Sequence, residues 1–361
     1  MKILMIVPDP MVKGGIAAVV NGYRGSSLEN NNQITYIESY RNGTKSQKLL
    51  KACHAYLQFV KEIRKNRPDV VHIHSSFGPS FYRKMPFILW GVHKRIPVVN
   101  HIHGAEFAPF YEEASAGKKN LIRKIYNKCT VLIVLSEEWK KKIGQIVPEE
   151  KLEILENYCK IPETINWAKR DSRQILFLGE LGKRKGCFDI PEILKKTITD
   201  VPDVRLVMAG DGELEQAKQV FADQNLLEKV TFPGWVRGKQ KEILLQESAV
   251  FLFPSYHEGM PMAVLEAMGY GLGIVTTKVG GIPKLIQDGE NGFCKEAGDV
   301  NSLAEAVSEW KWEWQPESLQ MKAMVWISIC TGCRKYMKRH AGRLVSDEFS
   351  YGRQLWDGFV E

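Results

Sequence analysis

The sequence predicts an α/β protein of two doubly wound halves that face each other across a cleft. Two observations predict this fold class. Short apolar runs alternate with amphipathic stretches along the chain, which is the pattern of βαβ units on an open parallel sheet. The same alternation starts again after residue 168, following a polar segment, 157–173, that contains Pro162 and lacks an apolar period. We therefore predict a linker at 157–173 between two parallel sheets.

The predicted strands of the first half are short and apolar throughout, as expected for strands buried on both faces of a parallel sheet. They lie at 2–7, 70–74, 97–103 and 131–136. A helix is predicted over 47–65, because apolar residues recur there at helical spacing. These residues are Leu49, Leu50, Ala52, Cys53, Tyr56, Leu57, Val60 and Ile63.

The second half repeats this arrangement. Its predicted strands lie at 174–179, 204–210, 229–234, 249–255 and 273–277. The domains are therefore expected to be Rossmann-like, the first over 1–168 and the second over 169–310. The remaining residues, 311–361, lack a clean helical period. We expect an atypical C-terminal tail there that crosses back to the first domain, with a sequence that is either divergent or altered.

The composition is that of a globular protein that does not span a membrane. Hydrophobic residues make up 44% of the chain and charged residues 25%, the proportions of a folded soluble domain. No run of about 18 apolar residues occurs, and the apolar start MKILMIV is too short for a signal-peptide core. We expect a cytoplasmic protein, either free or peripheral on the inner face of the membrane.

The seven cysteines are odd in number and scattered, which favours free thiols. Cys330 and Cys333 form the single C-x-x-C pair, and His340 is the one histidine close to them in sequence. A structural zinc site normally has four such ligands. A zinc site there is therefore disfavoured.

The net charge of +8 is unevenly distributed. Residues 1–168 contain 25 basic and 15 acidic side chains, while the rest of the chain contains 25 and 27. Within 41–100 the numbers are 12 and 2. An anionic partner is expected to approach this region, although a solvated basic face explains the charge as well.

The segment 254–271, PSYHEGMPMAVLEAMGYG, carries the strongest functional signal. It follows a predicted buried strand and is expected to open a helix at about Met260, with Pro261 in the first turn. The free amides of such a helix start suit a phosphate or a sugar hydroxyl. Glu258 and Glu266 stand eight residues apart around it, with Glu266 expected in an inward, paired position rather than on the surface.

This segment resembles the E-x7-E motif of glycosyltransferase family 4, enzymes of the GT-B fold that retain the anomeric configuration. The resemblance covers roughly 1–307. It implies that Glu258 contacts the donor sugar and that Glu266 binds the nucleotide ribose. It also implies that the backbone around Gly259, Met260 and Pro261 meets the sugar and the diphosphate.

Two motifs of the first half support the resemblance. Gly14 and Gly15 follow the first predicted strand, where paired glycines let a ligand approach the backbone, and they are similar to the family's diphosphate loop. His103, before Gly104, is similar to the family's active-site histidine. His101 is the alternative. His72 and His74 are expected to be structural and to point to opposite faces of their strand.

In the second half, Lys185 and Gly186 are similar to the family's donor-phosphate loop. An arginine usual in that family is replaced by Glu180, and a glutamate usual further on is replaced by Lys284. A carboxylate beside a diphosphate would repel it. We therefore expect either that Glu180 turns away or that Lys183 and Arg184 share the neutralising role with Lys185.

The expected activity is transfer of a sugar from a nucleotide-sugar donor to a saccharide or lipid-linked acceptor in surface polysaccharide synthesis. We expect the donor to be UDP-linked. No Asp-x-Asp in an appropriate setting occurs, so neither a metal nor another cofactor is expected. Lys185 and helix N-termini would then stabilise the departing diphosphate. By resemblance, a leaving-group oxygen takes the acceptor proton, while His103 orients the donor sugar. No feature indicates nucleic-acid binding.

Residues 80–95, SFYRKMPFILWGVHKR, form an amphipathic stretch bracketed by basic side chains. Together with the basic region 41–100 it fits docking on an anionic membrane surface. A half-buried crossover helix fits the same residues equally well. The two readings differ in whether Phe87–Trp90 face solvent or the core.

Two other functions fit parts of the sequence. A nicotinamide-dependent sugar oxidoreductase also uses Rossmann-like sheets, but the chain lacks the G-x-G-x-x-G fingerprint. A non-catalytic nucleotide-sugar-binding protein would tolerate Glu180 and Lys284.

Overall fold

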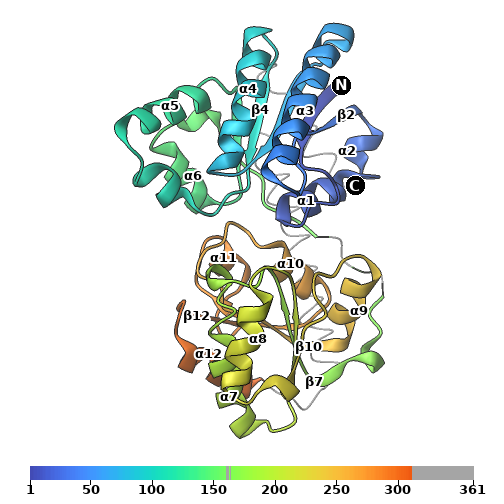
Figure 1. Cartoon of the computed structure of the whole chain (residues 1–361), viewed down its shortest axis with the longest axis vertical. Coiled ribbons are helices and arrows are strands. Elements are labelled where there is room, and N and C mark those ends of the chain that lie inside the picture. Colours follow the sequence, from blue (N-terminus) through green and yellow to red (C-terminus); the bar gives the residue numbers. More distant parts are fainter. Residues whose placement is uncertain (160–161, 163, 311–361) are drawn as a thin grey trace. The chain divides into compact units, whose positions relative to one another are not determined.

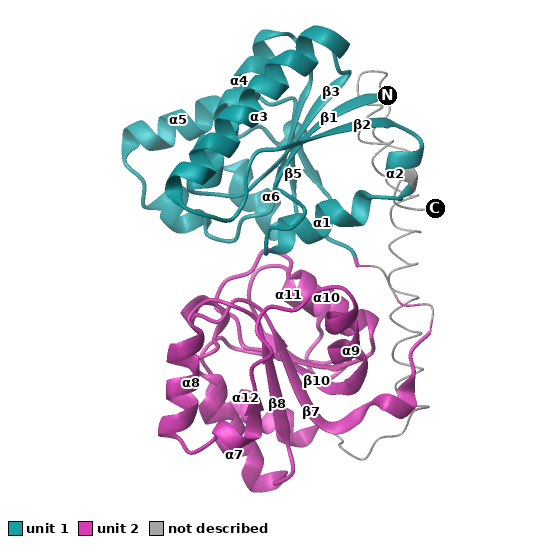
Figure 2. Ribbon diagram, turned by 45° about the vertical axis from the view of Figure 1, so that its right-hand side comes forward, with its two compact units in different colours: residues 1–158, 331–361 teal, residues 159–330 magenta. Residues whose placement is uncertain are grey.

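The computed structural model describes residues 1–159, 162 and 164–310. These residues form two compact units, which separate between Tyr158 and Cys159 (Figure 2). The expectations for 311–361, including the pair Cys330 and Cys333, lie outside the described residues.

Unit 1 is a parallel sheet with the strand order β2-β1-β3-β4-β5-β6 (Figure 1). The strands are β1 Lys2–Val7, β2 Gln33–Glu38, β3 Val70–Ser75, β4 Val98–Ile102, β5 Val131–Val134 and β6 Leu152–Ile154. The helices are α1 Gly15–Tyr23, α2 Ser27–Asn30, α3 Lys45–Asn66, α4 Pro79–His93, α5 Ala116–Tyr126 and α6 Glu137–Gly144. The four strands predicted for this half are confirmed.

The strands missed by the sequence analysis lie at the edges of this sheet. β2 is largely half-buried, so its polar and apolar side chains mix and give no continuous apolar run. β6 spans three residues, too few to show a period. The long α3 begins with a capping box, in which Thr44 Oγ1 accepts from the Gln47 amide and the Gln47 side chain accepts from the Thr44 amide.

Unit 2 is a second parallel sheet, in the order β12-β11-β10-β7-β8-β9. The strands are β7 Asp171–Leu178, β8 Arg205–Ala209, β9 Val230–Thr231, β10 Ser248–Phe253, β11 Gly273–Thr277 and β12 Phe293–Lys295. The helices are α7 Ile190–Asp200, α8 Leu214–Asp223, α9 Lys239–Glu247, α10 Met262–Gly269, α11 Ile282–Leu285 and α12 Val300–Glu309. The predicted two Rossmann-like sheets are therefore confirmed.

Unit 1 ends at Tyr158, whereas the sequence analysis extended the first domain to 168. Local contacts explain the difference. The Cys159 thiol donates to the Leu265 carbonyl, and the Arg170 guanidinium donates to the carbonyls of Tyr270 and Gly271. Polar side chains of this segment therefore bind backbone groups of unit 2, which the lack of an apolar period did not reveal.

Helix α4 is the half-buried crossover helix, not an exposed amphipathic one. Phe87 and Ile88 are each 1% exposed and belong to the core of unit 1. Lys84, expected on the basic surface, is 2% exposed and donates to Ser39 Oγ and the Ile6 carbonyl. Phe87 and Ile88 therefore do not face solvent, whereas Leu89 of the same segment is 39% exposed. Within the described residues, the structure has no helix of the length and apolarity needed to cross a bilayer.

Candidate functional site

In each sheet one point exists where the chain reverses the direction in which strands are added. Unit 1 adds β2 beside β1 and then places β3 on the other side of β1. Unit 2 adds β8 and β9 beside β7 and then places β10 on the other side of β7. Open α/β sheets bind ligands beyond the carboxyl ends of the strands at such switch points. The residues that follow β1, β3, β7 and β10 are therefore the candidates for a site.

The loop after β10 holds a buried carboxylate. Glu258 is 7% exposed, and its Oε1 lies 2.5 Å from the ammonium nitrogen of Lys185, which follows β7. Ser255 Oγ lies 2.6 Å from the same oxygen. Burial lowers the pKa of Lys185, and the Glu258 carboxylate opposes part of that shift. The two strands of the switch point thus bring a buried ion pair together from positions 73 residues apart in sequence.

Glycines set the backbone of this site. Gly186 adopts a left-handed conformation, and a Cβ there would lie 1.9 Å from the Pro254 carbonyl oxygen. Gly280 is also left-handed, and its Cβ would lie 2.0 Å from the Glu258 carbonyl oxygen. Neither contact leaves room for a side chain, so the loops after β7 and β11 close tightly on the loop that carries Glu258.

Glu180, the acidic residue at the expected arginine position, lies away from the buried pair. Its side chain is 64% exposed, and its Oε2 lies 3.3 Å from Arg184 Nη2. Arg184 Nη1 also donates to the His257 carbonyl and lies 3.9 Å from Glu258 Oε1. The Glu180 carboxylate is therefore paired with Arg184, and Lys185 is paired with Glu258.

Helix α10 begins at Met262, two residues after the position expected from sequence. Pro261 precedes the helix as its N-cap, with an extended ψ of 122°, rather than forming its first turn. A proline at that position has no side-chain acceptor for the first amides of the helix. Gly259, Met260 and Pro261 are all buried.

Glu266 lies on α10 with its side chain 19% exposed. Its Oε1 lies 2.6 Å from Lys241 Nζ, on α9. The expected inward, paired position is therefore what the structure shows. The partner was not predicted, because a lysine on a polar helix gives no sign of what it faces.

In unit 1, Gly14 precedes α1 and Gly15 is the first residue of that helix. Gly14 is the N-cap of α1 and has φ 134° and ψ 165°, a backbone conformation confined in practice to glycine. Both glycines are exposed, and no heavy atom would crowd a Cβ at Gly14. The requirement for glycine at 14 is therefore conformational.

His103 follows β4 and is held against the end of β3. Its amide donates to the Ser75 carbonyl, and its Nε2 lies 2.9 Å from His74 Nδ1. Burial, with a smaller contribution from His72, lowers the pKa of His103 to about 3. The imidazole is consequently neutral at physiological pH, and its hydrogen bond to His74 couples the tautomers of the two rings.

His103 is one of four histidines packed together. The rings of His72 and His74 lie 4.5 Å apart and those of His101 and His103 lie 4.0 Å apart. The expectation that His72 and His74 point to opposite faces was wrong, because residues i and i+2 of a strand share a face. His101, the alternative to His103, is fully buried, and neither ring nitrogen has a hydrogen-bond partner in the described residues.

Three of these histidines form the one group in the described chain whose ligand atoms lie close enough to hold a metal ion. The atoms of His72, His74 and His101 all lie within 4.8 Å of one another. Burial lowers the pKa of each ring, so each is neutral, as a metal ligand must be. Buried Lys84 adds a smaller contribution to the lowered pKa of His74, and burial also holds the pKa of Lys84 itself well below its ordinary value.

Comparison with known proteins identifies the class of enzyme. A family model described as "Glycosyltransferase Family 4" matches residues 16–158, and one described as "Glycosyl transferases group 1" matches residues 163–322. The two matches follow the two sheets of the structure. The chain is a glycosyltransferase.

The sequence of this glycosyltransferase is similar to those of several bacterial enzymes. It is 29% identical over 286 residues to an Escherichia coli UDP-Gal:alpha-D-GlcNAc-diphosphoundecaprenol alpha-1,3-galactosyltransferase, covering 72% of this chain and 70% of that protein. It is 25% identical over 247 residues to a Xanthomonas campestris GDP-mannose:cellobiosyl-diphosphopolyprenol alpha-mannosyltransferase, covering 66% and 63%.

Solved structures share the fold of this glycosyltransferase. Anabaena Alr3699/HepE in complex with UDP superposes with a TM-score of 0.68 at 16% identity, covering 94% of this chain and all of that one. The sucrose-phosphate synthase of Thermosynechococcus elongatus gives 0.68 at 16% identity, covering 94% and 99%. The predicted GT-B fold is confirmed.

Proposed function

We propose that this glycosyltransferase transfers a sugar from a UDP-linked donor, with retention of configuration and without a metal ion, to a saccharide or lipid-linked acceptor in surface polysaccharide assembly. The observation that carries the proposal is the buried Lys185–Glu258 pair at the switch point of the second sheet. The pair joins a cation and a carboxylate from the loops after β7 and β10, and α10 begins four residues after Glu258. These groups support the binding of a nucleotide-sugar.

Each group of this site has a role in the proposal. Lys185 and the amides at the start of α10 neutralise the departing diphosphate, whose charge grows as the sugar leaves. The Glu258 carboxylate accepts hydrogen bonds from sugar hydroxyls and holds the Lys185 ammonium in place. Glu266 accepts from the ribose diol. No metal is required in this scheme, because the protein's own cations meet the diphosphate.

The reaction exchanges one bond for another at the anomeric carbon. The bond to the diphosphate oxygen breaks, and the acceptor oxygen forms its bond on the same face. The acceptor proton passes to a diphosphate oxygen, so no side chain need take it. His103 is assigned the orienting of the donor sugar, since a neutral imidazole with a pKa of about 3 is a hydrogen-bonding group rather than a proton carrier in the physiological range.

The comparisons support the choice of donor and acceptor. Two solved structures with this fold are titled as complexes with UDP and with UDP-glucose. The E. coli and Xanthomonas relatives are named for polyprenol-diphosphate acceptors. A lipid-linked acceptor resides on a membrane, so the proposal includes a peripheral, cytoplasmic position at the inner face, reached through the basic region 41–100.

A donor screen tests the proposed function. Purified protein is incubated with UDP-, GDP- and ADP-linked sugars and a polyprenol-diphosphate saccharide or its soluble fragment, and nucleoside diphosphate release and product configuration are measured. Acceptor-dependent UDP release with a retained linkage is expected. Release from no donor, or an inverted linkage, would overturn the proposal.

A further inference from the structure

Helix α3 exposes leucines on the side that faces away from the core. Leu49, Leu50 and Leu57 are 66%, 70% and 69% exposed. The opposite side of the same helix buries Ala55, Phe59 and Ile63 in the core of unit 1. A helix that covers a sheet usually has a polar outer side, so the apolar outer side of α3 is not explained by the fold of unit 1.

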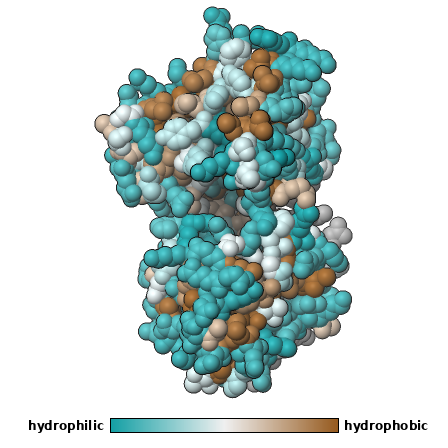
Figure 3. Space-filling model, viewed as in Figure 1, coloured by the Kyte–Doolittle hydropathy of each residue, from teal (hydrophilic) through white to brown (hydrophobic). Residues whose placement is uncertain are grey.

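The exposed leucines follow one line along the helix. Leu50, Cys53 and Leu57 are spaced by three and four residues and therefore share a face, and Cys53 is exposed too. The line continues at Val60 and Arg64. Figure 3 shows apolar surface among hydrophilic surface on this unit. The described surface is thus a ridge along the solvent side of α3, which we call the α3 ridge and define by Leu49, Leu50, Cys53, Leu57 and Val60.

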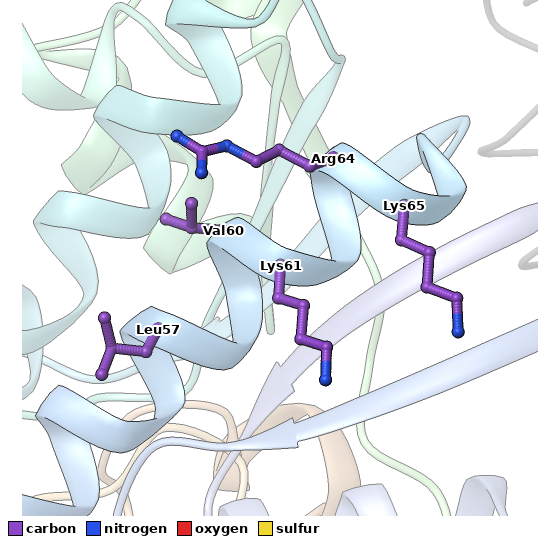
Figure 4. A pocket seen from close by; sticks show the side chains of 5 residues that line it. All are labelled: Leu57, Val60, Lys61, Arg64 and Lys65. Atoms are coloured by element: carbon purple, nitrogen blue, oxygen red, sulfur yellow. The ribbon is translucent and has the colours of Figure 1, made fainter.

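Basic side chains accompany the α3 ridge. A surface hollow at its carboxyl-terminal end is lined by Leu57, Val60, Lys61, Arg64 and Lys65. Figure 4 shows Leu57, Val60 and Arg64 extending to one side of α3 and Lys61 and Lys65 to the adjacent side. Residues 45–66 contain six basic side chains and one acidic side chain, Glu62. Apolar and cationic side chains therefore lie beside one another at the carboxyl-terminal end of α3.

We propose that the α3 ridge and its basic flank dock this glycosyltransferase on an anionic phospholipid bilayer. The inference deepens the proposed function and rests on its lipid-linked acceptor. Leucines on a helix lying in the membrane plane enter the boundary between headgroups and acyl chains. Lys61, Arg64 and Lys65 have long apolar stems that follow the leucines inward while their charged ends stay at the level of the lipid phosphates.

The positive charge beside the α3 ridge favours an anionic bilayer over other binding partners. In a symmetric dimer of two copies, the α3 ridge would meet itself, and the basic flanks would face each other without acidic partners. An anionic bilayer offers negative charge along the whole helix and an apolar phase beneath it. Each basic side chain near such a surface adds to the attraction. The surface that matches both properties of α3 is therefore anionic lipid.

Sedimentation with lipid vesicles tests this inference. Wild-type protein is mixed with vesicles of phosphatidylcholine alone or with phosphatidylglycerol added, at low and at high salt. We expect at least tenfold more bound protein on the anionic vesicles at low salt, and a steep loss with added salt because the attraction is screened. Two triple variants separate the contributions: Leu49→Gln/Leu50→Gln/Leu57→Gln and Lys61→Gln/Arg64→Gln/Lys65→Gln. Each is expected to lower binding at least tenfold.

A matched control removes the same charge elsewhere on unit 1. Lys118→Gln/Lys119→Gln/Lys124→Gln alters α5 and is expected to bind vesicles within about twofold of wild type. Equal losses from the α5 and α3 charge variants would overturn the inference, since any basic surface would then serve. Equal binding of wild type to neutral vesicles, or a concentration-dependent dimer that the leucine variant abolishes, would overturn it as well.

Turnover on a soluble acceptor fragment keeps the two proposals separate. The α3 variants are expected to release UDP from that fragment at the wild-type rate. A protein that turns over but binds no vesicles refutes the docking face and leaves the enzyme function intact. A protein that binds anionic vesicles through α3 but turns over no donor refutes the proposed function alone.

Discussion

The Lys185 ammonium nitrogen lies 2.5 Å from Glu258 Oε1, and the two side chains are 14% and 7% exposed. They follow β7 and β10, the neighbouring strands at which the second sheet reverses its direction of growth. A buried ion pair contributes little to net stability, because desolvation offsets the attraction. Its position at the switch point is better explained by the preorganisation of a charge for a ligand.

Removing the charge of Glu258 tests that role. Glu258→Gln keeps the size of the side chain but leaves Lys185 without its anionic partner, so the ammonium is no longer held toward the diphosphate. We expect turnover to fall about 100-fold, the loss that misplacing a catalytic group typically causes, while nucleotide affinity measured by calorimetry changes much less. The exposed Glu290→Gln is the control. Normal turnover of Glu258→Gln would show that this carboxylate has no part in the reaction.

Glu266 is predicted to bind the ribose. Glu266→Ala should weaken nucleotide binding by about tenfold or more, since hydrogen bonds to a charged group contribute about 1.5–3 kcal/mol. Lys241→Met is the matched variant, because it breaks the same ion pair but keeps the carboxylate. Calorimetry should show a larger loss for Glu266→Ala than for Lys241→Met. Equal losses would mean that the pair stabilises α9 against α10 and that Glu266 has no separate contact with the nucleotide.

Activity is predicted to survive metal removal. In the proposed mechanism, Lys185 and the start of α10 would supply the positive charge that a divalent ion otherwise supplies at the diphosphate. UDP release in excess EDTA should match the untreated rate, with a second measurement after dialysis to exclude slow exchange. Loss of activity that Mn²⁺ restores would overturn the metal-free mechanism. Metal analysis of the dialysed protein, compared with His72→Phe, would then show whether the histidine group held the ion.

The buried histidines predict a stability that decreases in acid. An unfolded histidine titrates near 6.5, whereas burial lowers the pKa of His72 and of His103 to about 3. Between these values the unfolded chain binds more protons than the folded chain. The free energy of unfolding should therefore be highest above pH 6.5 and should decrease as the pH drops toward 3. Each histidine contributes at most about 1.4 kcal/mol per pH unit.

His101→Phe tests the origin of this dependence. The ring keeps its size, and the variant removes two buried nitrogens that have no hydrogen-bond partner among the described residues. Urea unfolding at pH 7 should show little loss of stability, and the decline below pH 6.5 should be shallower than in wild type. The exposed His54→Gln should leave the decline unchanged. A decline of equal slope in His101→Phe would show that His101 makes no contribution to the pH dependence.

The sequence by itself determined the class of fold and the candidate functional residues on the loops. Continuous apolar runs such as 70–74 and 249–255 have few alternatives to a strand buried on both faces. Gly14 and Glu258 could be chosen because they follow such strands, and the carboxyl ends of parallel strands are where ligands bind. Lys185 was chosen through the resemblance of its loop to the donor-phosphate loop of the family. The sequence pattern also predicted the linker. It did not reveal that the side chains of Cys159 and Arg170 donate hydrogen bonds to backbone carbonyls of unit 2.

Tertiary structure alone decided which side chains meet and which face solvent. Lys185 and Glu258 are 73 residues apart, and the pairing of Glu266 with Lys241 depends on how α9 packs beside α10. Hydrophobic periodicity shows that a helix has an apolar side but not which of two apolar sides packs on the sheet. The sequence therefore left open whether Phe87 of α4 faces solvent or the core. The structure places Phe87 in the core, while Leu50 and Leu57 of α3 face solvent. Burial is a property of the packed neighbours, which the local sequence does not contain.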